Sequence, residues 1–271
     1  MDFSRVKTVV HPDYAYLEDF VRRLPQEEFP IDHVFCDRRN TVVATHEQGI
    51  PMVVKKYARP TVFNCFIYTL FRPTKAKRAY RYAMRLERCG VETAAPIGYV
   101  HVYRWGIFHT GYFLCRYLPY PTLASIKGLN EVEKQQLCDD FIAFTAFLHR
   151  HKLIPGDYNP GNILYHKDPD GKYHFALVDI NRFHFGYSSM ARCMRSFTQL
   201  SGVRLSQLAA LVGRYCDVRH WDIRRAWKYF LFYRNSLYRK ERIKSKFKSL
   251  LGLFALTLSE EAAFKHEMSL K

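Results

Sequence analysis

The chain has 271 residues, of which 48% are hydrophobic and 16% aromatic, so it can bury a core and is not intrinsically disordered. Its formal charge is +17, from 42 Lys and Arg against 25 Asp and Glu, which attracts phosphate-bearing partners such as nucleotides, nucleic acids and anionic lipids. We expect neither a membrane-spanning helix nor a signal peptide, because no apolar run has the required length or form.

The cysteines indicate a reducing, cytoplasmic setting. There are seven, an odd number that argues against a complete set of disulfides. None forms a CxxC pair, the spacing typical of zinc sites and thiol exchange. Most lie within apolar stretches, where Cys behaves as a small hydrophobic residue.

The first half of the chain predicts a small antiparallel sheet with one helix. Short apolar stretches at 34–36, 41–44 and 52–56 are separated by polar breaks, which is typical of a strand meander. Apolar residues then recur at helical spacing over 73–89, after Thr74 as a candidate N-cap. Two more strands are expected, at the ranges 96–103 and 109–116.

The second half predicts mainly helices around one hairpin. A long helix is expected over 130–150, with Asn130 as its N-cap. Two short strands, 163–165 and 175–178, are joined by the turn-forming segment 168–171. Helical periodicity returns beyond residue 188, through the ranges 205–216 and 221–237.

Three polar residues around the hairpin carry the chemistry. Asp157 precedes Asn162 by five positions, and Asp179 follows the second strand. Phosphoryl transfer needs a carboxylate to orient the attacking hydroxyl, and oxygen ligands for the magnesium on the nucleotide. The D-x-x-x-x-N spacing matches the catalytic loop of kinases, and Asp179-Ile180-Asn181 takes the place of their DFG motif. Asp157 and Asn162 could instead simply form turns, but the strand-turn-strand context favours the motif.

A lysine on the third strand completes the set. Val53-Val54-Lys55-Lys56 lies just ahead of the predicted helix, where a lysine could reach the nucleotide phosphates. Strand alternation points the two lysines to opposite faces, so only one faces the cleft. We favour Lys55, and the alternative is that both are solvated lysines of an edge strand.

These motifs resemble one known family, the lipopolysaccharide kinases of the Kdo/WaaP type and, within them, the InaA-like proteins. The resemblance rests on YNPGNIL at 158–164 and LVDINR at 177–182, and on KAKRAYRYAMRLERCGVETAAPIGY at 75–99. It extends over most of the chain, from about residue 42 to the helix at 221. It implies an α+β, protein-kinase-like bilobal fold, with a small antiparallel N-lobe sheet plus one helix and a larger, mainly helical C-lobe.

The resemblance also implies a division of the chain, a reaction and a set of roles. The N-lobe would span 1–117 and the C-lobe 118–271. ATP with Mg²⁺ would phosphorylate a sugar hydroxyl, of Kdo or heptose, in the lipopolysaccharide inner core. By position, Asp157 would be the catalytic base, Asn162 and Asp179 the metal ligands, and Lys55 the phosphate-binding lysine. Arg182 is a candidate for substrate or phosphate contact, with a structural ion pair as the alternative.

The sequence departs from the kinase pattern in three places. Pro155 stands where a histidine usually precedes the catalytic Asp. The loop at 38–40 is not rich in glycine. The helix glutamate that pairs with the strand lysine is also missing, because the candidate positions are Lys77, Ala79 and Arg81. The alternative function is therefore a weakly active or inactive kinase-like module that binds nucleotide or anionic glycolipid.

Two basic clusters indicate where other partners could bind. One lies on the helix at 73–89, and the other spans 234–248 ahead of an apolar stretch. Both suit an anionic membrane surface and a lipid A or core glycolipid acceptor, although each could be a solvated helix face. We do not expect nucleic acid, because the sequence has no RNP-like strand, KH-type loop or zinc finger. The expected location is cytoplasmic, peripheral on the cytoplasmic face of the inner membrane.

Overall fold

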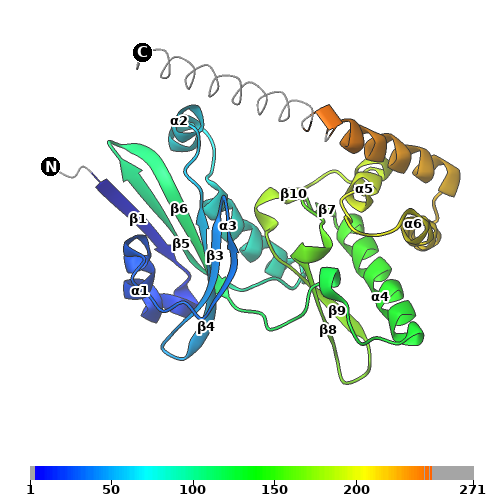
Figure 1. Ribbon diagram of the computed structural model, residues 1–271, viewed down its shortest axis with the longest axis horizontal. Coiled ribbons are helices and arrows are strands. Elements are labelled where there is room, and N and C mark those ends of the chain that lie inside the picture. Colours follow the sequence, from blue (N-terminus) through cyan, green and yellow to red (C-terminus); the bar gives the residue numbers. More distant parts are fainter. Residues whose placement is uncertain (1–3, 241, 244, 246–271) are drawn as a thin grey trace, which may run out of the picture.

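The computed structural model describes residues 4–240, 242–243 and 245, and it has two lobes (Figure 1). One lobe is built on a six-stranded antiparallel sheet, and the other is mainly helical with two small two-stranded sheets. Strand β6 is the last strand of this sheet in chain order and ends at Arg116. This is near the predicted boundary between the lobes at 117, which stays a prediction. Within the described residues, no helix is long and apolar enough to cross a membrane.

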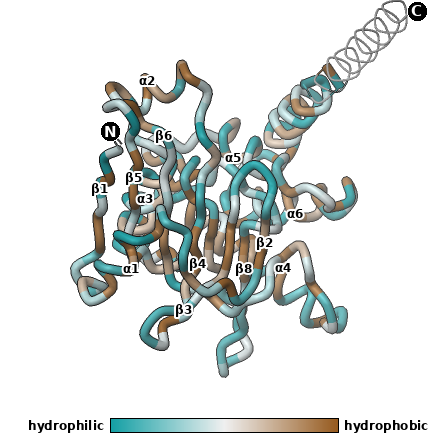
Figure 2. The backbone as a smooth tube through the Cα atoms, turned by 60° about the vertical axis from the view of Figure 1, so that its left-hand side comes forward, coloured by the Kyte–Doolittle hydropathy of each residue, from teal (hydrophilic) through white to brown (hydrophobic). Residues whose placement is uncertain are grey.

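The N-lobe sheet has the strand order β1-β5-β6-β4-β3-β2. The predicted meander and the two later strands are confirmed, and Figure 2 shows the apolar colour concentrated along the strands. The first strand, which pairs with β5 along its whole length, was not predicted. The strands are β1 (Ser4–Val10), β2 (His33–Asp37), β3 (Thr41–Glu47), β4 (Ile50–Tyr57), β5 (Pro96–Arg104) and β6 (Ile107–Arg116).

The N-lobe contains three α-helices, so the expectation of a single helix is wrong. They are α1 (Glu18–Arg23), α2 (Val62–Leu70) and α3 (Lys75–Arg88). Helix α1 packs Phe20 and Val21 against the sheet, and its six residues are too few for a clear helical period. Helix α2 is apolar on nearly all sides, so its sequence shows little contrast between a buried and an exposed face.

Helix α3 is the predicted helix, and its start is fixed by the expected cap. The Thr74 hydroxyl accepts a hydrogen bond from the Lys77 backbone N–H at 3.1 Å. The same hydroxyl lies 2.6 Å from His101 Nε2 on β5, so the cap also ties the helix to the sheet. Small alanines, Ala76 and Ala79 among them, form the buried face and let the helix approach closely. One end of α3 is thereby held beside the gap between the lobes.

The C-lobe follows the predicted order of elements. Helix α4 (Glu131–Arg150) begins at Asn130 with a capping box to Glu133, and α5 (Met190–Phe197) and α6 (Leu205–Arg219) pack near it. The predicted hairpin is β8 (Ile163–Lys167) with β9 (Tyr173–Leu177), and a second pair joins β7 (Leu153–Ile154) to β10 (His184–Phe185). A last helix begins at residue 223. The basic segment predicted up to 248 lies outside the described residues from 246 onward.

Candidate active site

The candidate catalytic loop lies between β7 and β8, and buried contacts hold it in place. The Tyr158 ring, next to Asp157, is fully buried, and its hydroxyl lies 2.8 Å from that of Thr145 on α4. The Tyr158 backbone N–H donates to Gln199 Oε1 at 2.7 Å. A 3-10 turn, Pro160–Asn162, then places Asn162 directly before β8. The part of the loop that follows Asp157 is thus held in place by these contacts.

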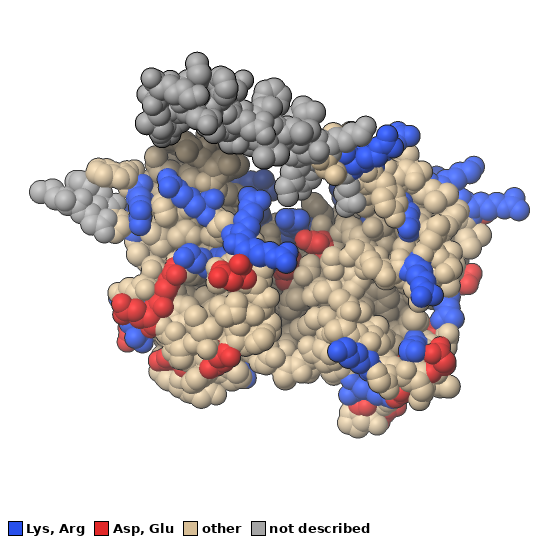
Figure 3. Space-filling model, in the orientation of Figure 1, with Lys and Arg blue, Asp and Glu red and all other residues tan. Residues whose placement is uncertain are grey.

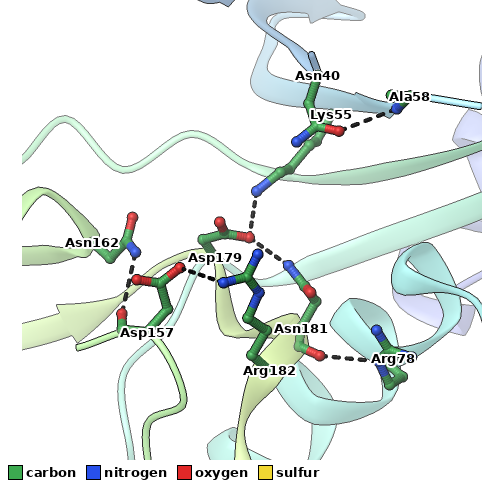
Figure 4. A network of polar contacts seen from close by, with 9 residues as sticks. All are labelled: Asn40, Lys55, Ala58, Arg78, Asp157, Asn162, Asp179, Asn181 and Arg182. Atoms are coloured by element: carbon green, nitrogen blue, oxygen red, sulfur yellow. Dashed lines mark hydrogen bonds and ion pairs between the residues drawn. The ribbon is translucent and has the colours of Figure 1, made fainter. Parts of the chain in front are cut away.

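Asp179 follows β9 and has a strained backbone. Its φ of 52° and ψ of 43° are left-handed, a conformation that a residue other than glycine adopts only where the surroundings impose it. Asp179 Oδ1 accepts hydrogen bonds from Lys55 Nζ and, at 2.5 Å, from Asn181 Nδ2. Figure 4 shows this carboxylate at the centre of the polar network, below Lys55. The strain falls on the residue that the sequence predicts as a metal ligand.

Gly156 joins the catalytic loop to the loop that carries Asp179. A Cβ atom at this position would lie 1.9 Å from the Arg182 carbonyl oxygen, far closer than any real contact. Only glycine allows the two loops to touch here. Asp157 lies next to this contact and Asp179 a few residues before Arg182, so the contact brings the two carboxylates to one place. The hollow between the loops is lined by Asp157, Asn162 and Asp179 together.

The two strand lysines point in opposite directions, as strand alternation requires. Lys55 reaches across to Asp179, and its side chain is only 16% exposed. Lys56 pairs instead with Glu27 in the N-lobe. The alternative of two lysines on an edge strand is wrong, because β4 pairs with both β3 and β6.

Helix α3 carries cations near the site, where kinases carry the helix glutamate. Lys55 takes Asp179 as its partner, while on α3 the charges of this pair act on Lys75 and Arg78 contacts the Asp179 loop. Arg78 donates from Nε to the Asn181 carbonyl at 3.0 Å and from Nη1 to the Pro73 carbonyl at 2.9 Å. Helix α3 is therefore fastened to the Asp179 loop by an arginine.

A group of cations surrounds the carboxylates. Burial lowers the pKa of Lys75, and the nearby charges of Arg39 and Arg182 lower it further. Arg39 comes from the tip of the β2–β3 hairpin, the position of the glycine-rich loop in kinases. That tip is held because the Ala58 backbone N–H donates to Asn40 Oδ1 at 3.1 Å. These contacts could not be found from sequence motifs, since isolated Lys and Arg residues carry no recognisable spacing.

The carboxylate of Asp157 has a raised pKa. Partial burial raises its pKa above the ordinary range, and the Arg182 guanidinium, 3.4 Å away, opposes this shift. The Asn162 side-chain N–H donates to the Asp157 backbone carbonyl at 3.2 Å. This bond uses the side-chain nitrogen of Asn162. It leaves the side-chain oxygen able to ligate a metal ion (Figure 4).

The site offers the oxygen atoms that magnesium requires. The Asn162 side-chain oxygen and the second carboxylate oxygen of Asp179 have no hydrogen bond among the described residues, and both side chains line the same hollow. Within that part of the chain, no cluster of three or more His, Cys, Asp or Glu forms another metal site. The residues fit a Mg²⁺ ion held by one carboxylate and one amide, with nucleotide phosphates completing its shell.

Comparison with known proteins finds similarity in structure and not in sequence. No protein-family model matches the chain, and no curated protein matches it. A solved structure of WaaP in complex with acyl carrier protein superimposes with a TM-score of 0.57 at 12% identity, covering 86% of this chain and 97% of that one. The chain has the protein-kinase-like fold. This confirms the predicted α+β, two-lobed architecture.

A second solved structure aligns with the chain at lower similarity. The Rio2 kinase complex with ADP, Mg²⁺ and phosphoaspartate from Chaetomium thermophilum aligns with a TM-score of 0.46 at 14% identity, covering 86% of this chain and 78% of that one. The protein-kinase-like fold gives a frame for the site, while the roles of Lys55, Asp157, Asn162 and Asp179 remain predictions.

Proposed function

We propose that this protein is an ATP-dependent kinase that phosphorylates a sugar hydroxyl, of Kdo or heptose, in the inner core of lipopolysaccharide. The observation that supports the reaction is the convergence of Asp157, Asn162 and Asp179 on one hollow, with Lys55 above them. The resemblance of the YNPGNIL and LVDINR motifs to lipopolysaccharide kinases supports the acceptor class.

Each residue has a distinct role in this proposal. Asp157 accepts the proton of the attacking hydroxyl, and its raised pKa brings it closer to the proton affinity that such a step needs. Asn162 and Asp179 hold Mg²⁺, which when bound neutralises charge on the phosphates of ATP. Lys55, Lys75 and Arg39 supply further positive charge to the triphosphate. These side chains take the place of the backbone amides of a glycine-rich loop.

The proposed location follows from the acceptor. A lipopolysaccharide core sugar is attached to a lipid, so the enzyme would work in the cytoplasm, peripherally on the cytoplasmic face of the inner membrane. The positive charge of the chain suits an anionic bilayer.

The second candidate is a kinase-like module that binds nucleotide or anionic glycolipid without turnover. One observation favours it: Lys55 pairs with the predicted metal ligand Asp179 and not with a helix glutamate. In the active kinase, ATP would have to draw Lys55 toward its phosphates and free the carboxylate for Mg²⁺. Tight Mg-ATP binding without transfer to any glycolipid would favour the module.

The deciding experiment compares lipid A and core from cells with and without the gene, by mass spectrometry. We expect the loss of one phosphate when the gene is absent, and its return with the wild-type gene. The Asp157→Asn gene should not restore it, since removing a general base lowers the rate by about 100-fold or more. Unchanged phosphorylation with this variant would refute the assignment of Asp157.

A stability measurement keeps this variant interpretable. Burial raises the pKa of Asp157 in the folded state, so the protonated carboxyl favours folding and the charged carboxylate opposes it. The stability that this group contributes at low pH is therefore lost as pH rises from the unfolded pKa through the folded pKa. Asp157→Asn should therefore be more stable than wild type at neutral pH, and the difference should vanish below the unfolded carboxyl pKa. Thermal unfolding at both pH values tests this, and a less stable variant at neutral pH contradicts it.

A further inference from the structure

Helix α2 carries an unusual exposed apolar surface. Phe63 is 74% exposed, Leu70 68% and Phe71, just after the helix, 83%. Only Cys65 of this helix is buried. Large aromatic side chains at successive turns give this short helix far more exposed apolar surface than a solvated helix usually has. The patch therefore indicates a binding surface. We define the α2 patch as Val62, Phe63, Phe66, Leu70 and Phe71.

Positive charge surrounds this patch, and negative charge is missing from the segment around it. The range 48–86, which contains α2 and most of α3, has no Asp or Glu. Arg59 and Arg72 flank the helix at its two ends. A protein partner of ordinary composition would not require such a one-sided charge, whereas the headgroups of an anionic bilayer would. The cations of this segment are Lys55, Lys56, Arg59, Arg72, Lys75, Lys77, Arg78, Arg81 and Arg85.

The last described helix, which begins at residue 223, presents a second basic surface. Its exposed positions recur at helical spacing, while Ala226 and Phe230 are buried on the opposite side. We define its outer face as Arg225, Lys228, Phe232, Asn235, Arg239 and Arg242. This face combines four cations with one exposed aromatic ring, the composition of an interfacial helix.

The two helices lie on the same side of the molecule. Figure 1 shows α2 at the top of the N-lobe and the last helix at the top of the C-lobe, on either side of the gap between the lobes. Figure 2, turned about the vertical axis, again shows α2 and the described part of the last helix at the top of the molecule. On the face drawn in Figure 3, Lys and Arg side chains lie beside the hollowed region between the lobes.

We infer that this side of the protein docks on an anionic lipid bilayer, with the α2 patch inserted among the headgroups and the outer face of the last helix lying against them. The inference rests on the proposed function, because a membrane-attached acceptor gives the docking its purpose. Vesicle binding can be measured without any transfer, so either proposal can fail alone.

The test is sedimentation of the full-length protein with phosphatidylcholine vesicles, with or without about a third phosphatidylglycerol. Wild type should bind the anionic vesicles at least about tenfold more tightly than the neutral ones, because each cation near the surface contributes to attraction. The variant Phe63→Ser with Phe71→Ser should lose at least about tenfold in binding to anionic vesicles, because inserted aromatic area is removed. Equal binding to both vesicle types, or by variant and wild type, overturns the inference.

Matched controls separate the surface from general changes in charge or hydrophobicity. Val132→Ser with Ile126→Ser removes exposed apolar residues near the start of α4, away from α2, and should leave binding unchanged. Arg225→Gln with Arg239→Gln should weaken binding to anionic vesicles, whereas Lys127→Gln with Lys172→Gln, equal in charge, should not. Unchanged circular dichroism verifies that each variant folds. If wild type instead forms dimers that Phe63→Ser with Phe71→Ser abolishes, the patch binds a second copy and the inference is wrong.

Discussion

The two walls of the cleft differ in how closely they follow the kinase pattern. The C-lobe wall has the expected set, with Asp157, Asn162 and Asp179 around one hollow. The N-lobe wall keeps only Lys55, and it replaces the glycine-rich loop with Arg39 and the helix glutamate with Lys75 and Arg78. One wall is acidic and the other basic, so they attract each other directly through Lys55 and Asp179.

This difference shows which parts of the site have alternatives. The predicted metal, Mg²⁺, prefers oxygen ligands, so few residue types could replace the predicted C-lobe ligands. Phosphate oxygens can be held by backbone amides, a lysine or an arginine. Different N-lobe residues could therefore serve the proposed binding of phosphate. The predictions that follow test this asymmetry, beginning with the metal ligands.

The largest effect is expected at Asp179. Asp179→Asn removes the charge of the predicted metal ligand, and metal ions contribute several kcal/mol to phosphoryl transfer, so turnover should fall by about 1,000-fold. Nucleotide affinity, measured with a fluorescent ATP analogue, should lose its dependence on Mg²⁺. A variant that still binds more tightly with Mg²⁺ than with EDTA would show that the metal is held elsewhere.

The contact between the two C-lobe loops should be nearly as sensitive. Gly156→Ala forces a Cβ against the Arg182 carbonyl, and overpacking of this kind destabilises by about 2–3 kcal/mol. Gly161→Ala is the matched control in the same loop, because its Cβ would meet only Asn159 Oδ1 at 3.4 Å. Urea unfolding measures both, and equal stability of the two variants would contradict the close contact.

A smaller effect is expected at the N-lobe wall. Arg39→Gln and Lys75→Gln should each raise the dissociation constant for Mg-ATP by about tenfold, the size of one charge-assisted hydrogen bond. Lys75 and Arg39 line a second hollow, in the N-lobe. Lys77→Gln removes the same charge from the same helix as Lys75→Gln, but outside that second hollow, and should have little effect. If all three variants bind alike, the N-lobe cations do not contact the phosphates.

A dependence of stability on pH is also expected, and it is shared by both lobes. Burial lowers the pKa of His101 in the N-lobe to about 4 and that of His149 in the C-lobe to about 3. Both take up protons when the chain unfolds, so stability is lost as pH falls below the ordinary histidine pKa of 6.5 toward these values. Urea unfolding at neutral and mildly acidic pH should show this loss.

A variant identifies the group that is responsible. His149→Gln should reduce the loss of stability on acidification, whatever its effect at neutral pH. His151→Gln changes the exposed histidine two positions later, at the end of α4, and should leave the pH dependence as it is in wild type. An unchanged pH dependence in His149→Gln would mean that this histidine is not neutral in the fold.

The sequence by itself determined the local elements and the residues of the C-lobe wall. Thr74 and Asn130 cap the predicted helices, and the hairpin turn at 168–171 lies where its residues require. These features depend on neighbours within a few positions, so they are visible as spacing. Asp157, Asn162 and Asp179 were found for the same reason, because the hairpin between them is short.

Only the tertiary structure decided the rest. The pairing of Lys55 with Asp179 joins residues 124 positions apart. The placement of Lys75, Arg78 and Arg39 around that pair depends on how α3 and the hairpin tip pack against the other lobe. Sequence spacing says nothing about such contacts, because charges on separate elements meet only when packing brings those elements together.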